Sequence, residues 1–220
     1  MLKGTGKSDN IGCSFCSQLE RNQMPNEYIK QSGIHNRVLD ESENFIAIPS
    51  ISPIVEGHVM IIPRYHISSM CQIKATEKSE FLNFAQNMIH AVERIYGDAA
   101  ITEHGIGNGK FGGCGVTHAH LHIIPIEKKI SCEILKQISE DFVVSGPIHL
   151  SGIFETGDSN HSYLIYGESL NKLYVSFQES IPSQYIRKSI AHHTSKSSWD
   201  WRQMFGWDDF VRTYEKLVTY

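Results

Sequence analysis

The chain has 220 residues, of which 40% are hydrophobic, and its formal net charge at pH 7 is −4. This length and hydrophobic content allow one substantial core. The acidic balance argues against a protein whose main work is to neutralise nucleic-acid phosphates or to coat an anionic membrane. The sequence has no apolar run of about 18 residues and no signal-peptide core at its start, and its five cysteines lack a disulfide-framework spacing. We therefore expect a soluble, cytoplasmic protein.

Two short motifs look like phosphate-binding loops but fail the test of context. Residues 4–8, GTGKS, end like a P-loop, yet Met1 stands where the first glycine belongs. Residues 107–112, GNGKFG, spell a dinucleotide-binding pattern but lead into a predicted strand instead of a helix. Neither motif supports a nucleotide-binding assignment by itself.

The first half of the chain reads as strands around one long helix. Alternating and apolar runs predict strands over 37–42, 44–51, 57–66 and 99–105. Residues 75–97 have apolar residues at helical spacing, with Thr76 as the expected N-cap and Gly97 as the stop. The order predicts an α+β fold, in which a helix packs across an antiparallel sheet.

The second half predicts a hairpin and two helices. Residues 161–169 and 172–180 alternate around a two-residue Leu-Asn turn, which is typical of a β-hairpin. A helix is expected to begin at Pro182 and run to residue 193. A second helix over 207–218 places five residues on one expected apolar face: Phe210, Val211, Tyr214, Leu217 and Val218.

Three histidines alternate with apolar residues in GVTHAHLHIIP, residues 115–125. Only a β-strand places residues i, i+2 and i+4 on one face, so the pattern predicts a strand with an imidazole face and a packed apolar face. The imidazole face should border a cavity or solvent. The backbones of His118 and His122 would lie about 13 Å apart, too far for all three histidines to bind one ion comfortably.

Cys13 and Cys16 have the C-x2-C spacing with which two thiolates bind one zinc ion from a tight turn. Two further ligands must come from elsewhere in the chain. Spacing alone does not choose among the candidates, which are His58, His66, His118, Cys71, Cys114 and Cys132. A redox role is disfavoured because no thioredoxin-like βαβ pattern surrounds the pair.

The sequence resembles the histidine triad (HIT) superfamily, whose signature alternates three histidines with apolar residues and is matched by HAHLHII. The segment GHVMIIPRYH at residues 57–66 resembles the second signature of the family. The N-terminal Cys-x2-Cys pair resembles the one found in its zinc-binding branch. The resemblance implies a HIT-like catalytic core with an N-terminal zinc-binding segment over 1–125. Residues 126–220 would be a C-terminal extension packed on that core.

The resemblance also implies a role for each site residue. His120 would be the nucleophile that attacks an α-phosphorus and becomes a nucleotidyl-histidine, with His122 and His58 as phosphate-binding histidines. Cys13, Cys16, His66 and His118 would bind one structural zinc ion. Substrate contacts are expected from five further residues: Ser50, Ile51, Gly113, Gly115 and Thr117.

The sequence departs from the family pattern in three places. Ser50 stands where many relatives have a ribose-binding aspartate, Glu103 and His104 stand near an expected asparagine, and Cys114 replaces a polar residue. These differences leave the substrate less defined than the phosphorus chemistry.

The leading hypothesis is a hydrolase that cleaves nucleoside phosphoramidates or dinucleoside polyphosphates. The alternatives are a nucleotidyltransferase or phosphorylase, a metal-dependent hydrolase with His118 and His120 on a catalytic ion, and a zinc-stabilised nucleotide-binding module without turnover. The expected partner is a small-molecule nucleotide, with no membrane and no extended nucleic acid, and a homodimer is one assembly to test. Arg187 and Lys188 could reach the outer phosphates of a polyphosphate, but we expect them to be solvated on an ordinary amphipathic helix.

Overall fold

The computed structural model describes residues 12–106, 116–156 and 161–218. The two motifs at residues 4–8 and 107–112 therefore lie outside the described residues. The strands are β1 (Asp40–Glu41), β2 (Phe45–Pro49), β3 (Val59–Pro63), β4 (Ala99–Gly105), β5 (Leu121–Pro125), β6 (Ser145–Ile148), β7 (Ser162–Ser169) and β8 (Lys172–Gln178). The helices are α1 (Ser14–Arg21), α2 (Asn26–Ser32), α3 (Lys78–Tyr96), α4 (Lys128–Asp141), α5 (Leu150–Thr156), α6 (Tyr185–His193) and α7 (Trp207–Leu217), with short 3-10 turns at Met70–Gln72 and Ala75–Glu77.

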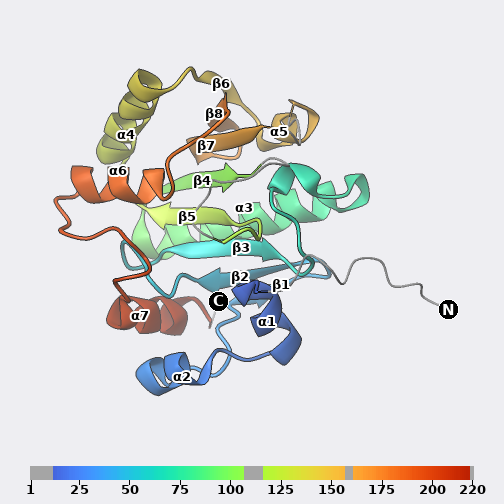
Figure 1. Cartoon of the computed structure of the whole chain (residues 1–220), viewed down its shortest axis with the longest axis vertical. Helices are drawn as coiled ribbons and strands as arrows, with labels where there is room; N and C mark the ends of the chain where they lie inside the picture. The colour runs from blue at the N-terminus through green and yellow to red at the C-terminus, as the bar shows by residue number, and fades with distance from the viewer. Residues whose placement is uncertain (1–11, 107–115, 157–160, 219–220) are drawn as a thin grey trace.

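All eight strands form one sheet in the order β1-β2-β3-β5-β4-β7-β8-β6, and every pair of neighbours is antiparallel (Figure 1). The sheet joins strands from both halves of the chain, because β7 pairs with β4. The division at residue 125 stays a prediction from the sequence.

Helices cover both faces of the sheet, which explains why its central strands are apolar almost throughout. On the first face, α3 and α5 pack on side chains such as Phe45, Ile61, Leu121 and Ile165. On the second face, α1 covers β2 and β3 through Phe15. α4 and α6 cover β4, β5 and β7 on that same second face. The histidines of the triad lie on the second face, between these two groups of helices.

The α+β class, the antiparallel sheet and the packed helix are confirmed. The hairpin is confirmed as β7 and β8, and Gly97 ends α3 with a φ of 84° that favours glycine. Thr76 as the N-cap is wrong. That residue lies in the 3-10 turn Ala75–Glu77, and the N-cap of the α-helix is the next residue, Glu77.

The histidine strand is shorter than predicted, because β5 begins only at Leu121 and contains His122 alone. Pairing with β3 covers Leu121 to Ile123. Before it, the chain leaves the ladder, and the Ala119 N–H donates to the Ile67 carbonyl instead. The alternation of sides persists, since Ala119, Leu121 and Ile123 are buried in the core of the first face.

The two C-terminal helices also differ from the prediction. α6 begins at Tyr185, three residues after Pro182. The preceding residue, Gln184, is the N-cap and has the left-handed backbone conformation. α7 begins at the predicted residue but ends at Leu217, one residue early, and Val218 is exposed whereas Thr213 is fully buried. The Thr213 hydroxyl accepts a hydrogen bond from the Gly57 N–H and donates to the Asp209 carbonyl, which allows a polar residue inside the packed face.

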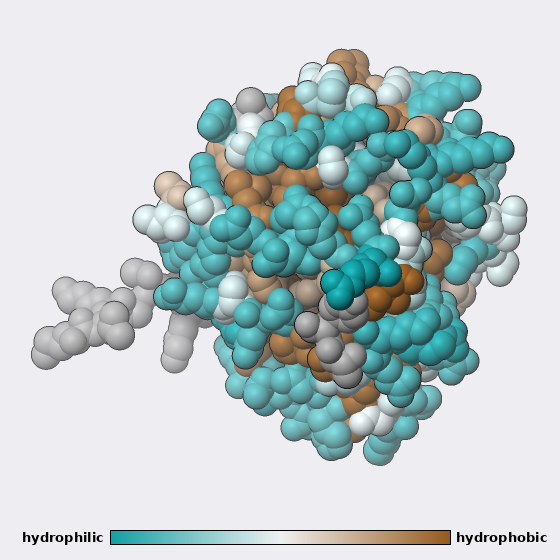
Figure 2. Space-filling model, turned by 180° about the vertical axis from the view of Figure 1, so that it is seen from behind, coloured by the Kyte–Doolittle hydropathy of each residue, from teal (hydrophilic) through white to brown (hydrophobic). Residues whose placement is uncertain are grey.

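Hydrophilic side chains cover most of the face seen in Figure 2, with hydrophobic residues showing between them. Within the described ranges, no helix is both long and apolar enough to span a membrane.

Candidate functional site

A cavity of about 160 Å³ opens on the second face of the sheet, between the α1–α2 region and α6. His120 and His122 form part of its wall, as the alternation predicted. The other lining residues are Ser14, Phe15, Gln18, Pro25, Tyr28, Arg37, Ser50, Ile51, Ser52, Met60, Val116, Arg187 and Trp201.

His120 is held by the backbone so that one ring nitrogen remains available. Its Nδ1 lies 2.7 Å from the His118 carbonyl oxygen, and a carbonyl can only accept, so Nδ1 carries the proton. Phe15 packs edge-on against the ring. Burial lowers the pKa of His120, and the bond to the His118 carbonyl partly offsets this effect. The arrangement gives a neutral imidazole with an unprotonated Nε2 in the cavity wall.

The His58 ring packs against the His122 ring, and His58 is fully buried. The Ile54 N–H donates to His58 Nδ1 over 3.4 Å, so His58 carries its proton on Nε2. That Nε2 lies 2.9 Å from His122 Nδ1 and donates to it. His122 must then carry its own proton on Nε2 and act there as a donor. His58 thus fixes the tautomer of His122.

Both of these imidazoles are neutral. Burial holds the pKa of His58 well below its ordinary value, and the positive charge of Arg187 and the proximity of His120 lower it further. Burial likewise holds the pKa of His122 well below its ordinary value, with further lowering by the neighbouring His120, His58 and Arg187. His104, on β4, has its pKa lowered to about 4 by burial. His104 borders a small second cavity together with His58, His122 and Arg187.

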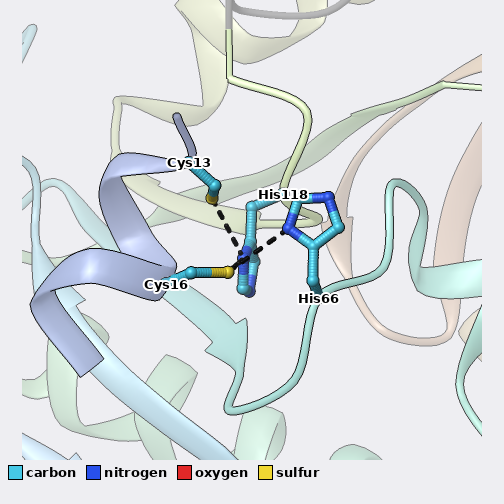
Figure 3. A group of neighbouring side chains, drawn as sticks. All are labelled: Cys13, Cys16, His66 and His118. Atoms are coloured by element: carbon cyan, nitrogen blue, oxygen red, sulfur yellow. Dashed lines mark hydrogen bonds between the residues drawn. The ribbon is translucent and has the colours of Figure 1, made fainter. Parts of the chain in front are cut away.

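Four side chains from three parts of the chain converge at one end of the triad (Figure 3): Cys13, Cys16, His66 and His118. Their ligand atoms all lie within 4.8 Å of one another. The Sγ atoms of Cys13 and Cys16 lie 3.6 and 3.5 Å from His118 Nδ1, and Cys16 Sγ lies 3.4 Å from His66 Nδ1. A tetrahedral zinc with bonds of about 2.3 Å to sulfur and about 2.0 Å to nitrogen would separate S and N by about 3.5 Å.

The orientation of His118 suits a metal ligand. Its Nε2 donates to the Pro63 carbonyl at 2.9 Å, so Nδ1 is the unprotonated nitrogen that faces the two sulfurs. Phe15, one residue before Cys16, packs edge-on against His118. These contacts join α1 to the segment that precedes β5.

The other predicted site residues are distributed unevenly. Ser50 and Ile51 line the large cavity, and the Ser50 N–H donates to the His58 carbonyl. Thr117 is exposed and does not contribute to that lining. Gly113 and Gly115, like Cys114, lie outside the described residues.

Glu103 points away from the histidines, into the core of the first face. Its carboxyl group accepts hydrogen bonds from the Tyr163 hydroxyl at 2.6 Å and from the Met70 N–H at 2.9 Å. Burial raises the pKa of Glu103 to about 7, although both hydrogen bonds act in the opposite direction. The carboxyl group anchors β4 to the 3-10 turn at Met70 and does not reach the cavity.

The expectation of a solvated Arg187 is wrong, whereas Lys188 is exposed as expected. Arg187 is only 5% exposed. Its Nε donates to the Trp199 carbonyl at 2.9 Å, and one terminal nitrogen donates to Ser52 Oγ at 3.3 Å. The C-terminal region therefore places a buried guanidinium beside His122.

Arg37 also lines the large cavity and is buried, and it was not among the predicted site residues. It donates to the Pro49 carbonyl at 2.9 Å and lies over the Phe15 ring. Burial lowers its pKa to about 10. The sequence contained no local signal for either arginine. His104, by contrast, follows from alternation on β4, where Thr102 is in register with His122.

Known proteins are similar to part of this chain. The family model for the HIT domain matches residues 31–129. A HIT-like protein of Chlamydia trachomatis is 33% identical over 86 residues, covering 38% of this chain and 75% of that protein. The bis(5'-nucleosyl)-tetraphosphatase (asymmetrical) of Schizosaccharomyces pombe is 26% identical over 106 residues, covering 48% of this chain and 58% of the yeast protein. The crystal structure of a Zn-bound histidine triad family protein from Mycobacterium smegmatis is similar with a TM-score of 0.39 and 21% identity, covering 54% of this chain and 78% of that one.

The chain belongs to the HIT family. The identity with the chlamydial protein, which extends over 75% of the latter, shows this membership. The match with the yeast enzyme spans less than two thirds of that protein.

Proposed function

We propose that this protein is a nucleotide hydrolase that cleaves at an α-phosphate through a nucleotidyl-histidine on His120. The observation that carries the proposal is the hydrogen bond from His120 Nδ1 to the His118 carbonyl, which presents an unprotonated Nε2 in the cavity wall. The substrate is a nucleoside phosphoramidate or a dinucleoside polyphosphate. The likeness to a dinucleoside tetraphosphatase supports this substrate class.

In the first step, the lone pair of His120 Nε2 attacks the α-phosphorus. A P–N bond forms while the bond from phosphorus to the leaving group breaks, and the leaving group keeps the bonding electrons. When the leaving group is an amine, its nitrogen also takes up a proton from water as it departs. The imidazole becomes cationic, and its Nδ1–H then donates a stronger, charge-assisted hydrogen bond to the His118 carbonyl. His122 donates from Nε2 to an oxygen on phosphorus, where negative charge develops in the transition state.

In the second step, water attacks phosphorus and the P–N electrons return to His120 Nε2. The surplus proton of the water leaves with solvent, so the enzyme is regenerated without any oxidant or further co-substrate. His58 does not touch the phosphate in this scheme. It is a positioning residue, because its Nε2–H fixes the tautomer of His122.

The converging cysteines and histidines bind one structural zinc ion in this proposal. Three S···N separations of 3.4 to 3.6 Å agree with the separation of about 3.5 Å expected in a tetrahedral site. Four protein ligands leave no open coordination position for water. His118 is therefore not a ligand of a catalytic ion, and His120 is not among the clustered ligand atoms in the described part of the chain.

Turnover of a panel of adenylated phosphoramidates and dinucleoside polyphosphates, followed by chromatography of the products, tests the activity. Wild-type protein should release a nucleoside monophosphate, and His120→Asn should not. Addition of orthophosphate or a sugar phosphate separates a hydrolase from a phosphorylase or a transferase, because only the latter two would transfer the nucleotidyl group to it. Binding without turnover would indicate the non-catalytic module. The cytoplasmic location and the homodimer stay predictions.

A further inference from the structure

Arg187 is a buried cation contributed by the C-terminal region, and it borders both cavities of the second face. Two hydrogen bonds fix its guanidinium group, one to the Trp199 carbonyl and one to Ser52 in the loop after β2. Both acceptors are neutral groups. Arginine is the side chain best suited to planar, multidentate binding of phosphate groups.

The segment that holds Arg187 is itself secured to the start of α6. The Gln184 side chain donates to Asp200 Oδ1 at 2.9 Å and accepts from the Trp201 N–H at 3.1 Å. Ser52, which binds the guanidinium, also donates to the Met204 carbonyl. These contacts place the guanidinium before any ligand arrives, which lowers the entropic cost of using it for binding.

The position of Arg187 relative to the triad indicates which part of a substrate it meets. The rings of Phe15, His120 and His122 follow one another along the wall, with centroid distances of 5.9 Å and 4.7 Å between neighbours. Arg187 lines the small second cavity together with His122 and His58. A phosphate chain that extends from His120 past His122 would reach this guanidinium.

We propose, on the basis of the function proposed above, that Arg187 binds the phosphate groups beyond the α-phosphate and makes the protein selective for substrates with a polyphosphate leaving group. The imidazoles beside it donate hydrogen bonds but carry no charge. A nucleoside polyphosphate leaves with several negative charges, which a permanent cation stabilises. An amine leaving group has no such charge, so Arg187 contributes little to cleavage of a phosphoramidate.

The test compares Arg187→Gln with wild type and with Lys188→Gln, which removes an exposed positive charge from the next position of the same helix. For Arg187→Gln, kcat/KM for diadenosine tetraphosphate should fall about a hundredfold, the usual effect of losing one strong donor. For adenosine phosphoramidate it should fall less than about fivefold. Lys188→Gln should match wild type with both substrates. Equal losses for the two substrates, or no loss for the tetraphosphate, would overturn the proposal.

Calorimetric binding of AMP and ATP separates this inference from the proposed catalysis. Wild type should bind ATP more tightly than AMP, and Arg187→Gln should remove most of that difference while leaving AMP affinity nearly unchanged. If no substrate is turned over but this pattern holds, the hydrolase assignment fails and the role of Arg187 stands. If Arg187→Gln does not fold, Arg187→Lys replaces it. Lysine presents a point charge instead of a planar guanidinium, so Arg187→Lys should reduce the preference for ATP over AMP about tenfold. An unchanged preference would contradict the proposal.

Discussion

Replacing Glu103 by glutamine should change the pH dependence of stability in a calculable way. The Glu103 carboxyl group is 1% exposed, and its pKa is raised from 4.5 to about 7, chiefly by burial. Tyr163 and Cys71 are the titratable groups that face it. The glutamine side chain cannot ionise, but its oxygen can still accept the hydrogen bond from the Met70 N–H.

The sign and size follow from proton linkage. Below pH 4.5 the carboxyl group is protonated in both the folded and the unfolded states, so it contributes no pH dependence. Between pH 4.5 and about 7, the unfolded state loses its proton while the folded state keeps it, so the free energy of unfolding decreases as pH rises. At about 1.4 kcal/mol per pH unit, this shift amounts to about 3 kcal/mol, and the effect is constant above pH 7.

Urea unfolding of both proteins at four pH values from 4.5 to 7.5 measures the effect. The unfolding free energy of Glu103→Gln minus that of wild type should increase by about 3 kcal/mol as the pH rises over this range. Groups distant from Glu103 make the same contribution in both proteins and cancel in the difference. Parallel curves for the two proteins would refute the reasoning, because Glu103 would then have an ordinary pKa.

Three further outcomes are expected. His122→Asn should lower kcat about a hundredfold to a thousandfold with little change in substrate affinity, since one donor among several is lost; a rate near wild type in steady-state assays would count against its donor role. Cys16→Ser should contain less than one zinc per chain by elemental analysis and should unfold at lower temperature, because structural zinc binding contributes to folding; full zinc content would contradict the ligand set. Gly105→Ala should cost more than about 1 kcal/mol in thermal unfolding, since a Cβ there would lie 2.2 Å from the Tyr163 ring, whereas Gly152→Ala has open space and is the matched control.

Features set by local pattern could be predicted from the sequence. The hairpin depends on two alternating runs and a two-residue turn, and α3 depends on helical periodicity with Gly97 behind it. The triad pattern likewise predicted a buried apolar side and a cavity side, although β5 includes only His122. The start of β5 is set by its pairing with β3. The local sequence of β5 does not indicate where that pairing begins.

Features set by contacts between distant segments could not be predicted. Arg187 looks like any basic residue on an amphipathic helix, and its burial depends on Ser52, 135 positions earlier in the chain. Glu103 and His104 are neighbours in sequence, yet they face opposite sides of the sheet. The register of β4 with β5 and β7 decides which of them faces the triad.

The central claim is that His120 Nε2 forms a covalent bond to the α-phosphorus. Wild-type protein is mixed with a dinucleoside polyphosphate radiolabelled at the α-phosphate, quenched during turnover, and digested at a pH that preserves phosphohistidine. Acid-labile label should appear on the peptide that contains residues 118–122, and no label should appear in His120→Asn despite retained substrate binding. Label on another peptide, or turnover by His120→Asn at near the wild-type rate, would contradict it.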